Sequence, residues 1–267
     1  MAETELQREA FMNLIRGFTI GKYIELCETI LSSRYIPDTV CGYLSQYDPS
    51  RPVAIIRHDV DLRVENALSM AEREADLGIK ATYYFRYPKT FDRYAIKQIQ
   101  DFGHEVGYHY EVLSKTRGNY EQALSLFVKE LAAFRAIGEI NTICMHGSPI
   151  SGYDNRDLWQ RCDFRDFQIL GDAYLSFIDS GLTYLSDTGR SWAGTNSVRD
   201  HMPGAINANP IRTTDDLIAM IKEEQDTGFY ITAHPVRWAS SSAEWVEGYV
   251  RDFVYNTGKK FLRAIRP

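Results

Sequence analysis

The sequence lacks the cysteine spacing of a zinc ribbon or of a disulfide-bonded scaffold. Its four cysteines are scattered along 267 residues and form no C-x-x-C pair; they are Cys27, Cys41, Cys144 and Cys162. This spacing excludes a zinc-ribbon module and gives no disulfide framework. We therefore expect reduced thiols, as in a cytosolic protein.

Long apolar runs and an excess of basic residues are missing as well. No segment approaches the roughly 20 apolar residues that a transmembrane helix needs, so no membrane span is expected. The first residues, MAETELQREAFMNLIRGF, lack the basic-then-apolar order of a signal peptide. The formal net charge of −6 argues against a nucleic-acid-binding protein. These absences favour a soluble protein of the cytoplasm.

The first 48 residues are predicted to form a helical extension that packs on a main domain of residues 49–267. Apolar residues recur at helical spacing in two stretches within residues 5–35. The segment Asp48-Pro49-Ser50-Arg51-Pro52 is rich in turn-forming residues and marks the boundary between the two parts.

From residue 53 onward, predicted strands and helices alternate. The strands are expected at 53–58, 81–86, 105–110, 140–145, 169–176, 182–186 and 229–233. Helices are expected at 63–77, 95–102, 120–137, 157–162, 215–227 and 243–255. This order predicts an α/β fold with a mainly parallel sheet, closed or partly closed into a barrel. In such barrels the chemistry lies at the carboxyl ends of the strands.

The first predicted strand ends in charged residues, in the sequence VAIIRHDVD. If the strand continues to residue 61, Asp59 and Asp61 lie on one face, because strand side chains alternate. Two adjacent carboxylates repel each other, and a hard cation or a shared proton relieves that repulsion. The pattern indicates a metal site or an acid–base site. Capping of the next helix by either aspartate is the alternative.

Four of the six histidines lie at the ends of predicted strands; they are His58, His109, His146 and His234. Because the carboxyl ends of parallel strands meet at one edge, we expect these imidazoles to converge. Imidazole and carboxylate ligands suit zinc and other first-row divalent ions. A bound ion of this kind polarises a carbonyl group and lowers the pKa of bound water to about 7. The sequence thus predicts a divalent metal cofactor, with zinc as the first choice, and a hydrolytic site.

At these residues the sequence resembles the polysaccharide deacetylase superfamily, of the NodB-homology or carbohydrate esterase 4 type. It is most similar to a cytoplasmic branch linked to the synthesis of O-antigen and other surface polysaccharides. The resemblance covers roughly residues 50–240. It implies an irregular (β/α)7 barrel and the metal-dependent hydrolysis of an N-acetyl group on a sugar.

The first motif of that family, usually Thr-Phe-Asp-Asp-Gly, corresponds to Arg57-His58-Asp59-Val60-Asp61. The resemblance implies that Asp59 is the general base. The family's metal-binding aspartate falls on Val60, so Asp61 is expected to bind the metal instead.

The second motif corresponds to residues 103–109, and it implies that His109 is a metal ligand. The last histidine of this motif falls on Leu113, so the family's Asp-His-His triad lacks one ligand. His146, at the end of the next strand, is the expected replacement, and Glu111 is the second choice.

The remaining motifs correspond less closely. The third has become Met145-His146-Gly147-Ser148-Pro149, which lacks the family's arginine beside the base, and Arg86 is expected in its place. Residues 186–192 resemble the fourth motif, and this resemblance implies that Asp187 is a catalytic residue. Residues 233–235 resemble the fifth, whose histidine, His234 here, acts as general acid.

Two aromatic residues are expected to contact the substrate. Trp192 resembles the tryptophan that walls the family's acetyl pocket, and Tyr108 lies within the second motif. Because the chain is expected in the cytoplasm, a nucleotide-linked or lipid-linked sugar is favoured over a finished wall polymer. A homo-oligomer is compatible with the predicted helical extension.

Two other functions stay open. The missing second-motif histidine at Leu113 is also compatible with a non-catalytic sugar-binding protein built on a deacetylase-like barrel. A different metal-dependent amidohydrolase ranks third, because such enzymes usually begin with His-x-His and the sequence here reads His58-Asp59-Val60.

Overall fold

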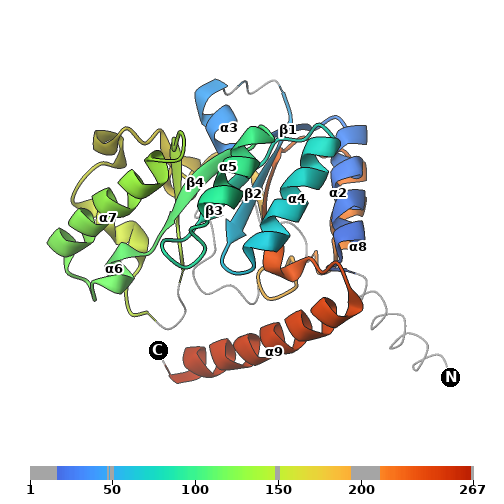
Figure 1. Ribbon diagram of the computed structural model, residues 1–267. Helices are drawn as coiled ribbons and strands as arrows, with labels where there is room; N and C mark the ends of the chain where they lie inside the picture. The colour runs from blue at the N-terminus through green and yellow to red at the C-terminus, as the bar shows by residue number, and fades with distance from the viewer. Residues whose placement is uncertain (1–16, 47, 49–50, 148–150, 194–210, 266–267) are drawn as a thin grey trace.

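A single parallel sheet with helices outside organises the protein (Figure 1). The computed structural model describes residues 17–46, 48, 51–147, 151–193 and 211–265. The strands run in the order β6-β5-β4-β3-β2-β8-β7, and every pair is parallel. They are β1 (Ile36–Asp38), β2 (Val53–Val60), β3 (Thr82–Phe85), β4 (Glu105–Tyr110), β5 (Thr142–Met145), β6 (Gly171–Asp172), β7 (Thr183–Ser186) and β8 (Phe229–Ala233). The α/β fold predicted from the alternation of elements is therefore confirmed.

The sheet is curled, so that its two ends approach each other across the interior. Tyr230 on β8 donates a hydrogen bond of 2.9 Å to the carbonyl oxygen of Ala173, which follows β6. The rings of Tyr174 and Tyr184 also approach from opposite ends of the strand order, with centroids 6.4 Å apart. Within the described residues, β6 and β7 do not pair with each other. The sheet is thus a partly closed barrel, as expected.

Helices α2, α4, α5 and α7 lie along the outer side of the sheet, α2 lies beside both α4 and α8, and α9 runs across one end of the molecule (Figure 1). The α-helices are α2 (Ile20–Ser32), α3 (Val40–Gln46), α4 (Val64–Asp76), α5 (Arg93–Asp101), α6 (Val112–Lys115), α7 (Tyr120–Arg135), α8 (Thr214–Lys222) and α9 (Ser242–Ile265). Short 3-10 helices span Asn155–Gln160, Phe164–Phe167, Leu175–Phe177 and Pro235–Arg237. Asn119 and Thr213 are the N-caps of α7 and α8. None of the described helices has the length and apolar character needed to cross a membrane.

Several elements differ from the sequence-based expectation, and helices α3 and α6 were not expected. Residues 36–38 form β1, which pairs with the first half of β2, so the segment before residue 49 contributes a strand as well as helices α2 and α3. The strand expected at 169–176 shortens to two residues, because a 3-10 helix follows at once. Helix α9 extends ten residues beyond the predicted end at residue 255. The earlier half of the predicted N-terminal helix pair lies outside the described residues.

The strand register stacks polar side chains inside the barrel. Asp59 pairs with Tyr84, and Tyr84 pairs with Gly107, so these residues form one layer of the inner face. A Cβ atom added to Gly107 would lie 2.2 Å from the ring of Tyr84, which explains why glycine occupies this position. One layer further toward the carboxyl ends, His109 pairs with Cys144. The register therefore brings ionisable groups of β2, β4 and β5 together.

Candidate active site

Asp59 is braced by a buried arginine from its own strand. Arg57 lies two residues earlier on β2, and strand side chains two apart share a face. Its Nε lies 3.0 Å from Oδ1 of Asp59, and its Nη2 donates to Oδ2 at 3.1 Å. Tyr174 and Tyr230 accept further hydrogen bonds from the guanidinium at 2.8 and 3.2 Å. Burial alone would lower the pKa of Arg57, but the charge of Asp59 raises it well above its usual value.

Arg86 does not take the place expected for it beside Asp59. Its guanidinium donates to Glu111 at 2.8 Å and lies 3.5 Å from Oδ1 of Asp61. Arg57 occupies the expected position instead. The i−2 spacing within β2 was the sequence signal for Arg57, because a residue two before Asp59 must share its face.

Asp61 faces two imidazoles. Its Oδ1 atom lies 3.7 Å from Nε2 of His109 and 3.5 Å from Nε2 of His146, yet this buried oxygen has no hydrogen-bond partner. Burial alone would raise the pKa of Asp61, but the charges of His146, His109 and nearby groups lower it strongly. Ligands of one tetrahedral zinc ion lie about 3.4 Å apart. We call Asp61, His109 and His146 the outer site; its donor set suits a divalent ion, and Oδ1 of Asp61 lies within 3.7 Å of both Nε2 atoms.

The imidazole of His109 is suited to bind a metal. Its Nδ1 lies 3.0 Å from the carbonyl oxygen of Cys144, which can only accept a hydrogen bond. Nδ1 therefore carries the proton, and Nε2 keeps a lone pair directed toward Asp59 and Asp61, at 3.9 and 3.7 Å. Burial lowers the pKa of His109 to about 4, so the ring is neutral near pH 7. A neutral imidazole is the form that coordinates metal ions.

His146 is oriented from behind by Glu111. Its Nδ1 lies 3.0 Å from Oε2 of Glu111, whereas its Nε2 faces Asp61. Burial would raise the pKa of Glu111, but His146 and Arg86 lower it well below its usual range. A carboxylate behind a histidine is a common arrangement at metal sites, because it fixes the ring's orientation. Two residues were considered from sequence as the replacement ligand. His146 is the one that faces Asp61, whereas Glu111 lies on the far side of the His146 ring.

Cys144 also lies in this cluster, and sequence reasoning missed it. One ligand atom each from Asp59, His109 and Cys144 lie within 4.8 Å of one another, and all three residues are buried. The Sγ atom of Cys144 lies 3.8 Å from Oδ1 of Asp59. The signal was weak, because the register that sets Cys144 beside His109 is a tertiary feature.

His234 and Asp187 form a buried pair at the end of β8. Nδ1 of His234 lies 2.6 Å from Oδ1 of Asp187, and the backbone N–H of His234 donates to Oδ2 at 2.9 Å. Burial and the charge of Arg237 would lower the pKa of His234, but Asp187 raises it above its usual value. Burial would raise the pKa of Asp187, but His234 and Arg237 lower it. The structure therefore joins the two residues that the fourth and fifth motifs had suggested.

Tyr108 and Trp192 do not lie where a substrate could touch them. Tyr108 precedes His109 on β4 and so points to the opposite face, where its hydroxyl donates to Glu130 of α7. It is 0% exposed. Trp192 is also buried; its Nε1 donates to Thr214 at 3.2 Å and its ring stacks on Phe18. Both expected substrate contacts are corrected to packing residues.

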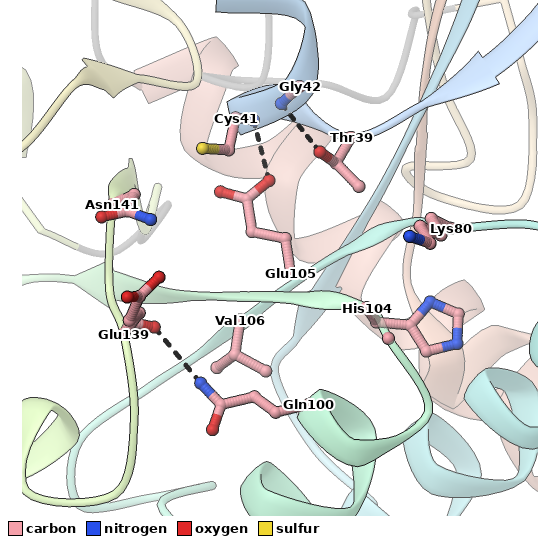
Figure 2. A pocket seen from close by; sticks show the side chains of 11 residues that line it. Thr39, Cys41, Gly42, Lys80, Gln100, His104, Glu105, Val106, Glu139 and Asn141 are labelled. Atoms are coloured by element: carbon pink, nitrogen blue, oxygen red, sulfur yellow. Dashed lines mark hydrogen bonds between the residues drawn. The ribbon is translucent and has the colours of Figure 1, made fainter. Parts of the chain in front are cut away.

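A separate hollow lies at the other end of the sheet, around the amino ends of β3, β4 and β5 (Figure 2). It has a volume of about 410 Å³, and Lys80, Glu105 and Asn141 contribute to its lining. Figure 2 shows the Glu105 carboxylate accepting the backbone N–H of Cys41, at 2.8 Å. Thr82 and Thr142 also donate to this carboxylate, so it ties α3 to the sheet. Because the hollow lies at the amino ends of the strands, it is separate from the outer site at their carboxyl ends.

No family model matches the sequence, and no curated protein matches it. Among solved structures, the fold is similar to a CE4 family pseudoenzyme from Bacillus anthracis, with a TM-score of 0.44 and 15% identity over 78% of this chain. The chain spans 62% of that protein's length. It is also similar to a family 4 carbohydrate esterase from Streptomyces lividans in complex with acetate (TM-score 0.44, 13% identity, 76% of this chain and 88% of that one). The peptidoglycan deacetylase PdaC from Bacillus subtilis has a TM-score of 0.39 and 15% identity, over 82% of this chain and 99% of its own.

Proposed function

We propose that the protein is a metal-dependent hydrolase that removes an N-acetyl group from a sugar. The observation that carries this proposal is the meeting of three units at the carboxyl ends of the strands. They are the Arg57–Asp59 pair, the outer site and the His234–Asp187 pair. Together they supply a base, a metal position and an acid, which are the groups that amide hydrolysis needs.

The outer site is proposed to hold the cofactor, with zinc as the first choice. Two imidazoles and one carboxylate are a ligand set found at catalytic zinc sites, which leave a further position open. When bound, such an ion polarises the acetamide carbonyl and promotes ionisation of water. Asp61 has the lowered pKa and the unpartnered oxygen that a ligand requires.

Asp59 is proposed to act as general base toward the attacking water. Arg57 donates a hydrogen bond to Oδ2 of Asp59 and lies 3.0 Å from Oδ1, so this ion pair restricts the orientation of the carboxylate. A carboxylate positioned in this way can accept the proton of a water molecule as that water attacks the carbonyl carbon.

His234 is proposed to act as general acid. Because Asp187 raises the pKa of His234, the imidazolium persists to higher pH than that of an unperturbed histidine. Asp187 occupies Nδ1, so the opposite nitrogen, Nε2, is the one that can deliver a proton. The nitrogen of the departing amine needs that proton when the C–N bond breaks.

The sequence motifs support finer assignments within this proposal. They favour membership of the polysaccharide deacetylase superfamily and a role in the synthesis of O-antigen or a similar surface polysaccharide. The substrate would then be a small-molecule or lipid-linked sugar, processed in the cytoplasm. Residues 1–48 are proposed as an extension of the barrel, and the Tyr23 hydroxyl supports this by donating to Glu74 of α4.

Replacing Asp59 with Asn tests the proposed chemistry. The amide cannot accept the proton of water, so acetate release from nucleotide-linked N-acetylhexosamines should fall by about 100-fold or more. Metal content should stay at the wild-type level, because the outer site keeps its ligands. Asp101→Asn, on the exposed end of α5, serves as the matched control and should keep full activity. Unchanged turnover in Asp59→Asn would remove Asp59 from the role of base.

A non-catalytic sugar-binding protein is the second candidate. The specific observation is Leu113, which is buried on α6 and replaces the histidine of the second motif. Sugar binding by a protein that retains no metal after purification in metal-containing buffer would favour this candidate.

A further inference from the structure

We infer that the ionisable side chains inside the barrel form a second, deeper metal position beside the outer site. This position selects soft ions, and an ion bound there inhibits the enzyme. We call Asp59, His109 and Cys144 the deep site. Its binding property is independent of the reaction, and only its inhibitory effect rests on the proposed function.

The geometry of the deep site is that of a compact ligand group. The three ligand atoms lie within 4.8 Å of one another. Nε2 of His109 lies 3.9 Å from Oδ2 of Asp59, and Sγ of Cys144 lies 3.8 Å from Oδ1. The exposed fractions of Asp59, His109 and Cys144 are 3%, 2% and 0%. An ion at this position would therefore be enclosed by protein.

The chemistry of the ligands selects the ion. A thiolate is a soft ligand that favours soft ions such as cadmium and cuprous ions over magnesium, calcium and manganese. Binding exchanges one proton for one metal bond: the Cys144 S–H bond breaks, an S–metal bond forms, and the proton passes to solvent. His109 needs no such exchange, because its Nε2 already carries a lone pair.

Arg57 sharpens this selection. Its guanidinium lies 3.0 Å from the carboxylate of Asp59 and therefore repels a cation bound to the same carboxylate. A hard ion at the deep site would gain only one anionic ligand, Asp59, against this charge. A soft ion gains the Cys144 thiolate as a second anionic ligand, so the repulsion is offset only for ions that bind sulfur strongly.

Occupation of the deep site conflicts with the proposed reaction. His109 belongs to both the outer site and the deep site, so the two positions compete for one nitrogen. Asp59, the proposed base, becomes a metal ligand when the deep site is filled and can no longer accept a proton from water. An excess of a soft ion should therefore inhibit, whereas an excess of magnesium should not.

Cadmium titration of the metal-free full-length protein tests the deep site directly. Cadmium bound to a thiolate gives a charge-transfer absorption in the ultraviolet, and we expect this band in the wild type. Cys144→Ser should lose the band while its thermal unfolding stays close to that of the wild type. Cys162→Ser is the matched control. The Cys162 thiol donates to the Leu158 carbonyl and is not part of the deep site, so this variant should keep the absorption band. Cys144→Ala is the second variant if the serine variant does not fold.

The outcomes separate this inference from the proposed function. Absence of the band in the wild type, or its persistence in Cys144→Ser, would overturn the deep site whether or not the protein releases acetate. A band that depends on Cys144 in a protein without deacetylase activity would support the deep site and contradict the proposed function. In an active protein, we further expect cadmium in excess to inhibit the wild type at least tenfold more than Cys144→Ser.

Discussion

At the scale of single residues, Arg57 is the unusual feature of the interior. A guanidinium with no exposed surface is costly to bury unless charge and hydrogen bonds compensate it. Asp59 supplies the charge, and the Tyr174 ring lies 4.4 Å from the guanidinium carbon in a cation–π contact. The same compensation fixes the orientation of Asp59. Stability and the proposed base are therefore coupled through one ion pair.

Replacing Arg57 with Met should destabilise the protein strongly. It leaves Asp59 buried without its counter-charge, and removing one partner of a buried ion pair costs about 3–5 kcal/mol. The free energy of unfolding, measured by urea denaturation, should fall by that amount. Arg165→Met breaks the exposed pair with Asp163 and should change it by less than about 1 kcal/mol. Equal effects of the two variants would contradict the bracing role of Arg57.

Asp187→Asn should move the pH dependence of the reaction. Asp187 raises the pKa of His234, so its removal lowers that pKa. A general acid is active below its pKa, and the rate falls as pH rises through it. The high-pH limb of kcat/KM should therefore shift to lower pH in Asp187→Asn. An unshifted limb in a folded variant would separate His234 from the acid step.

Prediction from sequence succeeded for residues whose face of the sheet is set by the two-residue period of a strand. Asp59 and Asp61, two residues apart, lie on the same side, although β2 ends at Val60, and His109 lies on the inner face of β4. His58, one residue before Asp59, points the other way: its Nε2 lies 2.7 Å from Glu74 of α4, so the expectation that it converges with the other imidazoles is wrong. The same parity places Tyr108 on the outer face, so its assignment as a substrate contact was avoidable. The same parity places Cys144 on the inner face, two residues before the expected ligand His146, whereas its pairing with His109 depends on the tertiary register. Trp192 packs through contacts between distant segments, which no local pattern reveals.

At the scale of elements, the close approach of β3 and β4 depends on Gly107. The added Cβ at this position would meet the Tyr84 ring at 2.2 Å and the Thr142 carbonyl oxygen at 2.8 Å. The ring can move, but the backbone oxygen belongs to a buried strand. Strand β4 carries His109, so a shift of β4 would also disturb both metal positions.

Gly107→Ala should therefore lower the free energy of unfolding by about 1–3 kcal/mol, the usual cost of overpacking a core. Gly21→Ala is the matched control, because its added Cβ on α2 meets no atom within 4 Å. Alanine is the better helix former, so the control should be neutral or slightly stabilised. Thermal and urea unfolding of the two variants give the comparison. A neutral Gly107→Ala would show that the strands can separate without cost.

At the scale of the whole molecule, the two ends of the sheet differ in character. The carboxyl ends gather ionisable groups from β2, β4 and β5 and from the segments that follow β7 and β8, and this follows from parallel strands that all end at one edge. The amino ends form the hollow around Glu105, whose carboxylate is occupied by structural hydrogen bonds (Figure 2). The alternation of elements predicted this polarity, whereas the curl that brings Tyr230 to Ala173 depends on packing across the interior.

The central claim is that a bound divalent ion and the surrounding acid–base groups hydrolyse a sugar N-acetyl group. Its most direct test is the release of acetate from nucleotide-linked N-acetylhexosamines by metal-free protein titrated with zinc. We predict no acetate without metal and a rate that rises up to one equivalent of zinc. Acetate release that is unaffected by removing the metal, or none at any zinc concentration, would contradict the account.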